Sequence, residues 1–526
     1  MKRNLLLLSL LLVCGVLGAR MYKAIEPHPQ LAFGSAGITE LRYRGWQLLS
    51  YGDLRVSHVI MRDASGRDYP APLDSTLQSD AAAGTVVRKF GWGEVEVRYT
   101  PKAGRLNIAV TVRNRSADTL REASYEPLAL HFPARVAEYD GAIPLVGHNV
   151  GDPTIISMSW PNGKVVLAND DVVRPLLAGF PWSIDRPANA TFPLRICTGR
   201  DPMLPDMLPF IDRPVPPGSA DSYSLSLRFG SPDATVEKMA DDILKSFAAH
   251  FPPQLKWKDR RPVGTVFLST SGLGAPKNPR GWLLDKTLDV TTEAGREAFR
   301  TRILDTADST VAILRNMNAQ GAITWDIEGQ EFPAASYAGD PRLFAKLAPE
   351  MAGVADEYFR RIREAGFRVG VTVRPQQIVF DDQHRASEVE VPDPGRLLEE
   401  KIRWARERWG ATLFFVDSNG GPSRPLDAAV LEKVAADIPD VLLVPEHKNV
   451  RYFAFSAPYF SLRDGLVSTP AVIRAVYPNA FSFVNTADGP IVKRRDELTA
   501  AVKQGDVLLY RSWYEDPANA EVKSLY

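Results

Sequence analysis

The sequence contains little cysteine, and this scarcity excludes two kinds of structural support. Only Cys14 and Cys197 occur among the 526 residues. Loss of an N-terminal leader would leave Cys197 alone, so the mature chain could form no intramolecular disulfide. Two cysteines also exclude a structural zinc site built from a cysteine cluster. A large core needs no disulfide, so the scarcity is compatible with export.

The chain also lacks an excess of charge of either sign. It has 63 basic and 63 acidic residues, which provides no electrostatic basis for binding nucleic acid or an anionic membrane. No phosphate-binding glycine fingerprint follows any of its apolar runs, and this argues against a nucleotide-binding role. We therefore expect no nucleic-acid partner and no cofactor.

The N-terminus has the pattern of a targeting segment. Lys2 and Arg3 precede an apolar stretch at 5–17 that is too short to span a bilayer comfortably. We predict that residues 1–19 are a signal peptide and that the protein is periplasmic or extracellular. An uncleaved N-terminal anchor and lipidation of Cys14 are the alternatives, and we expect no other association with a membrane.

The first half of the chain has the pattern of an antiparallel β-sandwich. A length of 526 residues suggests more than one domain. Strict alternation of apolar and polar residues at 94–99 and 106–113 indicates strands with one wet face, separated by turn signals such as Asn162-Gly163. We predict a β-sandwich at 24–230, followed by a linker helix within 231–261.

The second half, 262–526, predicts a (β/α)8 barrel. Short apolar runs alternate with amphipathic helical patterns, which implies a parallel sheet. The runs lie at 265–269, 322–327, 368–373, 412–417, 441–446, 480–484 and 507–510, with a weaker one at 459–462. The helical patterns lie at 295–319, 342–365, 395–409, 427–437 and 495–504. A doubly wound open sheet is the alternative.

Acidic residues stand at the C-terminal ends of several of these runs. Asp326 and Glu328 follow the second expected strand, Asp417 the fourth and Glu446 the fifth. Barrel active sites lie at this end of the strands. The candidate catalytic residues are Asp417 and Glu446. The candidate substrate-binding residues are Trp325, Asp326, Glu328, Arg374, Asn419, His447, Lys448, Arg511, Trp513 and Tyr514. No metal ligands are predicted.

These residue types suit hydrolysis of a glycosidic bond. One carboxylate attacks or activates water, and one carboxylic acid protonates the leaving oxygen. Asp417 and Glu446 follow neighbouring strands, which favours a close pair and retention of configuration. Trp325 and Trp513 offer rings for sugar faces, and Arg374 offers a charge that holds a carboxylate ionised or binds an acidic sugar.

Each candidate also has an ordinary structural role to offer. An Asp after a strand is often a helix cap or turn residue, and Arg374 would serve equally as a buried ion-pair partner. Asp326 and Glu328 are two positions apart, so on a continued strand they would point the same way. His447 fits a supporting position better than that of a ligand. Acidic residues at three strand ends favour a site over independent caps.

A β-sandwich, a linker helix and a barrel with acidic strand ends resemble the retaining glycoside hydrolases of the α-glucosidase and α-galactosidase type. An Asp after the fourth strand and a Glu after the fifth are similar to the α-amylase superfamily. That resemblance implies Asp417 as nucleophile and Glu446 as acid/base, although Phe415 stands where the superfamily has an arginine. In the α-galactosidase type the acid follows the sixth strand, where Asp464 is the candidate.

Two other functions are compatible with the pattern. Asp326 or Glu328, together with Asp417 and Glu446, would supply oxygen ligands for Mg²⁺ or Ca²⁺ in a metal-dependent barrel enzyme. A non-catalytic carbohydrate-binding surface protein would use the aromatic residues but would not need the carboxylates. The principal prediction is an exported glycosidase with a carbohydrate substrate.

Overall fold

The computed structural model of the chain describes residues 28–133, 138–140, 155–174, 176–180, 190–199, 212–270, 275–330, 337–382, 386–419, 426–447, 449–462, 467–511 and 519–526. The described residues form two compact units, which divide between Ile243 and Leu244. The domain boundaries drawn from the sequence stay a prediction.

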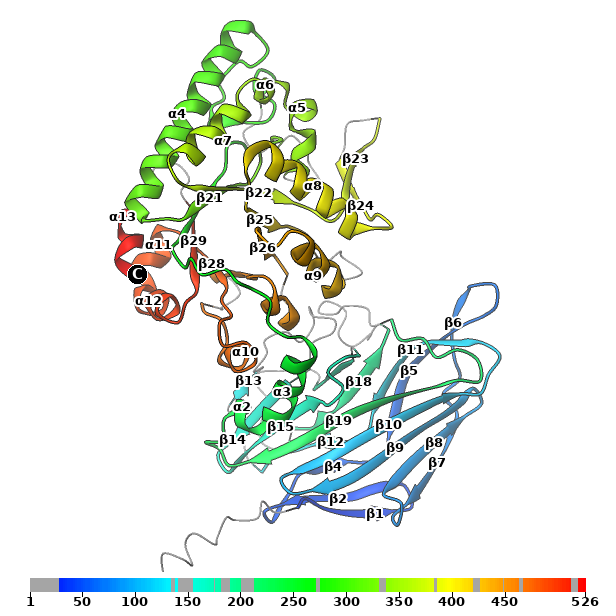
Figure 1. Cartoon of the computed structure of the whole chain (residues 1–526). Coiled ribbons are helices and arrows are strands. Elements are labelled where there is room, and N and C mark those ends of the chain that lie inside the picture. Colours follow the sequence, from blue (N-terminus) through cyan, green and yellow to red (C-terminus); the bar gives the residue numbers. More distant parts are fainter. Residues whose placement is uncertain are drawn as a thin grey trace, which may run out of the picture. The chain divides into compact units, whose positions relative to one another are not determined.

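The first unit consists of antiparallel sheets (Figure 1). The largest sheet has, in spatial order, β13 (Glu138–Asp140), β14 (Ile155–Trp160), β15 (Gly163–Asn169), β19 (Ala220–Gly230), β10 (Arg105–Asn114), β9 (Gly93–Lys102), β8 (Thr85–Phe90) and β7 (Ser75–Asp80). A second sheet has β16 (Leu177–Gly179), β18 (Arg195–Thr198), β11 (Thr119–Glu126), β5 (Arg55–Arg62) and β6 (Asp68–Pro70). Two three-stranded sheets comprise β1 (Gln30–Gly34), β2 (Gly37–Tyr43) and β3 (Trp46–Gln47), and β17 (Phe192–Pro193), β12 (Ala129–Leu130) and β4 (Leu49–Tyr51).

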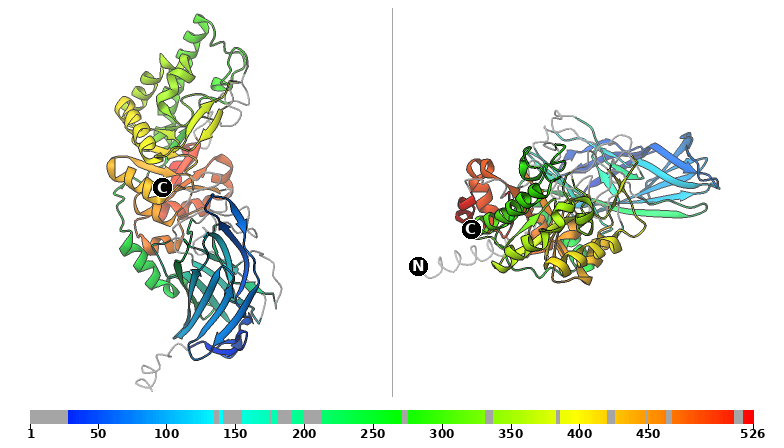
Figure 2. Two further views of the ribbon diagram at one scale, coloured as in Figure 1. Left: turned by 90° about the vertical axis from the view of Figure 1, so that its right-hand side faces the viewer. Right: turned by 90° about the horizontal axis from the view of Figure 1, so that it is seen from above.

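The period of two in the sequence explains how these strands form. In β10, Ile108 and Val110 are fully buried, and each lies opposite an apolar residue of β9, Tyr99 and Val97 respectively. Alternate residues turn to the other face, as the pleat of a strand requires. The long strands of this unit run side by side (Figure 2), and the antiparallel β-sandwich predicted from the sequence is confirmed.

Two short helices follow β19 where the sequence predicts one helix. They are α2 (Val236–Met239) and α3 (Asp241–His250). Thr235 caps α2 by accepting a hydrogen bond from the backbone N–H of Lys238 at 3.3 Å. The break falls at Ala240, whose backbone has φ −112° and ψ 14°. Ile243 and Phe247, two apolar positions at helical spacing, are buried.

The second unit contains eight parallel strands in one sheet. In chain order they are β20 (Val263–Val266), β21 (Gly321–Thr324), β22 (Arg368–Val373), β25 (Leu413–Val416), β26 (Leu442–Pro445), β27 (Tyr459–Ser461), β28 (Phe483–Thr486) and β29 (Val507–Arg511). Their spatial order is β26-β25-β22-β21-β20-β29-β28-β27. The backbone N–H of Ala457 donates to the carbonyl of Leu443 at 3.1 Å and links the two end strands. The predicted (β/α)8 barrel is confirmed.

Helices connect most of these strands and lie along the outside of the barrel (Figure 1). The principal ones are α4 (Glu293–Met317), α7 (Ala355–Glu364), α8 (Pro394–Trp409), α9 (Ala428–Asp437) and α12 (Arg495–Lys503). Shorter ones are η2 (Trp282–Leu284), η3 (Pro341–Leu343), α5 (Phe344–Leu347), α6 (Pro349–Ala352), η4 (Val450–Ala454), α10 (Ala471–Val476), α11 (Asp488–Lys493), α13 (Asn519–Val522) and η6 (Lys523–Leu525). A two-stranded hairpin, β23 (Gln377–Phe380) and β24 (Ala386–Val389), follows β22.

The helical pattern at 342–365 is one long helix in the sequence but four short pieces in the structure. Pro349 begins α6, because proline has no N–H to continue the preceding turn. Gly353 then ends it. Gly410, by contrast, ends α8 as the sequence predicts. It lies in the left-handed region at φ 69°, and its N–H bonds to carbonyls of the last turn.

Two strands are displaced from their apolar runs for one physical reason. The first strand was expected at 265–269, but β20 ends at Val266. The backbone N–H groups of Leu268 and Ser269 bond to the carboxylate of Asp326 instead of to a neighbouring strand. The seventh strand was expected at 480–484, but β28 begins at Phe483. The N–H of Ser482, just before it, bonds to the buried carboxylate of Asp506. In both places a buried carboxylate replaces the partner that a neighbouring strand would supply.

Candidate active site

Parallel register brings the acidic strand ends of the barrel to one edge. Val416 pairs with Pro445 across β25 and β26, so Asp417 and Glu446 follow directly at adjacent positions. Val373 pairs with Val416 across β22 and β25, which places Arg374 beside Asp417 on the other side. The pairing of these three residues therefore follows from the apolar strands that carry them.

Asp417 is buried and holds the centre of this group. Its Oδ2 lies 2.5 Å from Nη2 of Arg374, and Glu446 and Tyr337 also act on its charge. Burial raises the pKa of Asp417 to about 7, Arg374 opposes that rise, and the Glu446 carboxyl adds to it. A pKa near neutrality lets this carboxyl change its charge in the physiological range.

Glu446 is more exposed than Asp417 and is fixed through one oxygen. Its Oε2 accepts a hydrogen bond from the backbone N–H of Ser418 at 2.9 Å, and 35% of its side chain is exposed. Nε2 of His447 lies 3.8 Å from the same oxygen. Ser418 adopts the left-handed conformation at φ 50°, which is uncommon for a residue other than glycine and turns the chain sharply after Asp417.

Amide side chains join the loops on both sides of Ser418. Oδ1 of Asn419 accepts from the backbone N–H of His447 at 2.8 Å, and its Nδ2 donates to the hydroxyl of Tyr452 at 3.1 Å. Nε2 of Gln376 donates to the carbonyl of Ser418 at 2.8 Å. Asn419 was predicted to bind substrate. Its side-chain hydrogen bonds instead connect the loop after Asp417 to the loop after Glu446.

Asp326 and Glu328 do not share one direction, so the expectation drawn from their spacing is wrong. The strand ends at Thr324, and a turn follows in which the N–H of Gly329 bonds to the carbonyl of Asp326 at 2.9 Å. Gly329 has φ 85°, and a Cβ there would lie 2.3 Å from Cδ of Arg280. A turn in place of a strand sends the two carboxyls to different surroundings.

Asp326 is fully buried, and its carboxylate is occupied by the protein. It accepts from the backbone N–H of Leu268 at 2.9 Å, from the N–H and hydroxyl of Ser269 at 2.8 and 2.7 Å, and from Nε2 of Gln330 at 3.0 Å. Burial raises its pKa to about 6 although these donors oppose the rise. Asp326 thus ties the end of β20 to the end of β21, and this arrangement favours a structural role.

Replacement of Asp326 by Ala should therefore destabilise the barrel. The variant leaves two buried N–H groups and a hydroxyl without their acceptor, and we expect a loss of about 1–3 kcal/mol in the free energy of unfolding. Urea unfolding of Asp326→Ala measures it, with Asp305→Ala, an exposed position on α4, as the matched control. Equal unfolding midpoints for the two variants would contradict the assignment.

Glu328 is buried without a full set of partners. Its side chain is 1% exposed, and Oε1 has no hydrogen-bond partner among the residues that the structure describes. Burial raises its pKa to about 8, and the nearby charge of Asp340 adds to the rise. Glu328 is thus mostly protonated at neutral pH, which suits neither a nucleophile nor the ionised ligand of a cation.

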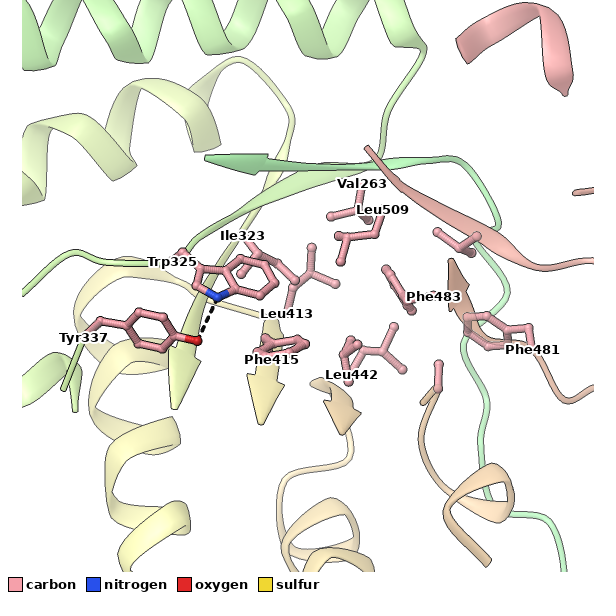
Figure 3. Packing of buried hydrophobic residues seen from close by; sticks show 13 residues of the cluster. Val263, Ile323, Trp325, Tyr337, Leu413, Phe415, Leu442, Phe481, Phe483 and Leu509 are labelled. Carbon is pink, nitrogen blue, oxygen red and sulfur yellow. Dashed lines mark hydrogen bonds between the residues drawn. The ribbon is translucent and has the colours of Figure 1, made fainter. Parts of the chain in front are cut away.

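Trp325 lies in the core cluster of the barrel and offers little surface to a sugar (Figure 3). It is 8% exposed. Its ring lies 5.4 Å from that of Phe267 and 4.4 Å from that of Phe415, centroid to centroid. Nε1 donates to the hydroxyl of Tyr337 at 3.0 Å. The contacts favour a role in supporting Tyr337, and through it Asp417, over the predicted stacking on substrate.

Several predicted site residues lie outside what the structure describes. Lys448, Trp513, Tyr514 and Asp464 fall outside the described residues, and Arg511 is placed only as the last residue of β29. Of the predicted set, the described structure brings together Asp417, Glu446, Arg374, Asn419 and His447. Asp326, Glu328 and Trp325 lie beneath or beside this group in buried positions.

Some residues of the site carry no sequence signal or a neglected one. Tyr337 follows no strand, and nothing near it predicts that it acts on the pKa of Asp417. Glu388 of β24 forms an ion pair with Arg374, although a hairpin glutamate looks like a solvent-facing residue. Lys401 was detectable, because it interrupts the apolar stripe of α8 formed by Leu398, Ile402 and Ala405.

The arrangement does not favour the metal-dependent alternative. Asp326 is already satisfied by protein donors, and Glu328 is held in its neutral range. Within the described part of the chain, no group of three or more His, Cys, Asp or Glu side chains is arranged to hold a metal ion.

Among the described residues, no helix has the length and apolar character needed to cross a membrane.

Comparisons with known proteins find likeness in structure only. No family model and no curated protein sequence matches the chain. The α-galactosidase from Lactobacillus brevis is 9% identical with a TM-score of 0.42, and the match covers 96% of this chain and 78% of that one. The galactosidase domain of the α-galactosidase–sucrose kinase AgaSK is 9% identical with a TM-score of 0.39, covering 92% and 72%.

The Thermotoga maritima α-fucosidase is 13% identical with a TM-score of 0.31, and the match covers 53% of this chain and 74% of that one. Because all three TM-scores lie below 0.5, we assign no activity to this chain on their strength. These three neighbours are glycoside hydrolases by name, and the comparisons identify no specific family for this chain.

Proposed function

We propose that this protein is a glycoside hydrolase in which Asp417 is the nucleophile and Glu446 the acid/base. The observation that carries the proposal is the pairing of the two carboxyls at adjacent strand ends, with Arg374 on Asp417. Two carboxyl groups in one cleft are what hydrolysis of a glycosidic bond requires.

The surroundings of the two carboxyls support this division of roles. Asp417 is buried and is held by Arg374, so its position is fixed for attack and the guanidinium favours its ionised form. Glu446 is about one-third exposed, so a leaving group and then a water molecule can reach it. It gives its proton to the leaving oxygen in the first step and regains one from water in the second.

The reaction would then proceed by double displacement. A carboxylate oxygen of Asp417 bonds to the anomeric carbon while the bond to the leaving oxygen breaks, and Glu446 gives its proton to that oxygen. In the second step Glu446 takes a proton from water, the water oxygen bonds to the anomeric carbon, and Asp417 leaves as a carboxylate. Because Asp417 and Glu446 follow directly paired residues of adjacent strands, we expect the short carboxyl separation of a retaining enzyme.

Activity screening tests the proposal directly. The purified full chain would be assayed against 4-nitrophenyl α- and β-glycosides of galactose, glucose, mannose and fucose, and against polysaccharides. We expect hydrolysis of at least one substrate, and NMR of the first product formed should show the anomeric configuration of the substrate. Hydrolysis with inversion would overturn the double displacement. Sugar binding without hydrolysis of any substrate would favour the non-catalytic surface protein.

Arg374 provides a prediction about pH. Hydrolysis by this mechanism requires ionised Asp417, so kcat/KM should rise as pH increases through about 7, the pKa of that carboxyl. Arg374 lowers this pKa, so Arg374→Met should move the rise to higher pH, by about 1–3 units for a charge at this distance. The measurement is kcat/KM from pH 5 to 10. Arg396→Met, an exposed arginine on α8, is the control, and an unshifted profile for Arg374→Met would contradict the pairing.

We also propose that the chain is exported. The support is the sequence pattern at 1–19, where a basic start precedes a short apolar stretch. Fractionation of the native source and intact-mass measurement test it. We expect a mature protein outside the cytoplasm that lacks the leader or keeps it as an anchor. A full-length cytoplasmic species would contradict export.

A further inference from the structure

Lys401 is a lysine buried inside the barrel wall. It lies on the inward face of α8 with 0% of its side chain exposed. Its Nζ donates to three backbone carbonyls, those of Gly339 at 3.2 Å, Arg374 at 2.8 Å and Gln376 at 2.9 Å. All three ammonium protons thus have an acceptor, which compensates part of the cost of burying the charge.

The three acceptors surround one residue of the candidate site. Arg374 gives its own carbonyl to Lys401, and its N–H donates to the carbonyl of Gly339 at 2.9 Å, which Lys401 also binds. Gly339 has φ 61°, and a Cβ there would lie 2.5 Å from Cγ of Arg374. The backbone and the stem of Arg374 are therefore enclosed by a small, fully bonded group with Lys401 at its centre.

The carbonyl groups of segment 374–376 need a hydrogen-bond donor from another part of the chain. The segment lies beyond the end of β22, where the strand ladder no longer supplies partners, and Pro375 has no N–H of its own. The side chains of Arg374 and Gln376 reach Asp417 and the carbonyl of Ser418 respectively. A shift of the segment would therefore move both contacts to the turn that carries Asp417.

We propose that Lys401 is a positioning residue that holds the backbone on both sides of Arg374 and so keeps its guanidinium on Asp417. This inference rests on the proposed function. A buried cation is a poor source of stability compared with an apolar side chain of similar size, and an apolar residue would complete the stripe of α8. Lys401 differs from an apolar residue in that it binds three backbone carbonyls.

Charged groups on several elements face Lys401. Asp340, which is paired with Arg342, has Oδ2 3.7 Å from Nζ, and Glu328 and Arg374 also act on the lysine. Burial lowers the pKa of Lys401 to about 8, while Asp340 opposes the fall. Asp417 in turn is faced by Arg374, Glu446 and Tyr337. Removal of the Lys401 side chain would therefore affect the charge of Asp417 through the position of Arg374.

The test is Lys401→Met, which keeps the length of the stem and removes the donors. In folded protein we expect kcat/KM for the best aryl glycoside to fall at least about tenfold, the equivalent of one lost hydrogen bond, mainly through kcat. The rise of kcat/KM with pH should also move to higher pH. Lys433→Met, an exposed lysine on α9, should change neither. A folded Lys401→Met with the wild-type pH profile would overturn the proposal.

Two further measurements keep the test decisive. If Lys401→Met does not fold, Lys401→Gln, which retains two N–H donors without the charge, should give a smaller shift in the same direction. Hydrogen exchange of the Arg374 amide needs no activity, and it should quicken at least about tenfold in Lys401→Met while the interior amides of β22 keep their rates. If the wild type hydrolyses nothing, the proposed function fails and exchange still decides the positioning role. Uniformly faster exchange would show general destabilisation and overturn it.

Discussion

Replacement of Asp417 by Asn should lower kcat by at least about 10⁴-fold, as expected when a covalent nucleophile is lost. The amide has nearly the shape of the carboxylate but cannot form the glycosyl-enzyme bond. Substrate binding should persist, and titration of the inactive variant with uncleaved substrate measures it. Asp427→Asn is the matched control, because Asp427 caps α9 on the same loop connection and asparagine can also cap a helix.

Glu446→Gln should affect substrates unequally. With a natural glycoside the loss of acid catalysis should reduce turnover by about 10²–10⁴-fold, whereas an aryl glycoside with an activated leaving group should lose much less in the first step. Comparison of kcat/KM for the two substrates measures this difference. Wild-type rates on the natural substrate for both Asp417→Asn and Glu446→Gln would contradict the assignment of these carboxyls.

Replacement of Glu328 by Gln should change how stability depends on pH. In the folded protein the pKa of Glu328 is raised to about 8 from an ordinary value of 4.5. Between these values the unfolded chain loses the proton that the folded chain keeps, so the stability of the wild type falls as pH rises. The stabilising effect of the proton is complete below about 4.5 and is lost by about pH 8. The glutamine side chain does not titrate, so the variant should lose this slope.

The expected size is on the order of 3–4 kcal/mol between pH 5 and 8, measured as the difference in the free energy of unfolding in urea. Asp326, whose pKa is also raised, contributes equally to wild type and variant and cancels in the comparison. Glu407→Gln, an exposed position on α8, should leave the slope of the wild type unchanged. Parallel stability curves for the wild type and Glu328→Gln would contradict the buried, protonated state.

The sequence predicted the positions of the central carboxyls better than their roles. Asp417 and Glu446 follow fully apolar runs, and a buried parallel strand has a defined end, so their place at the barrel edge followed from the pattern. Asp326 ends an equally apolar run, yet its carboxylate is saturated by Leu268, Ser269 and Gln330. No local feature distinguishes the two cases, because the donors to Asp326 come from another strand end.

Trp325 illustrates the same limit for aromatic residues. A tryptophan at a strand end in the sequence is compatible with a sugar platform and with a core position alike. Only the tertiary structure decides, because Phe267 and Phe415 pack against its ring. Tyr337 could not be predicted, since it follows no strand and its effect on Asp417 is set by packing in space.

The pattern of residues along the chain was enough to predict the two architectures, the order of the strands and the ends at which carboxylates stand. Periods of two and 3.6 residues and the ends of apolar runs are local properties, and they persist in any fold that buries them. Which carboxyl is exposed, which is saturated and which has a raised pKa depended instead on the packing of the barrel. Charge, burial and hydrogen bonding at Asp417 are set by Arg374, Tyr337 and Glu446, which are distant in sequence, because a pKa responds to what surrounds a group in space.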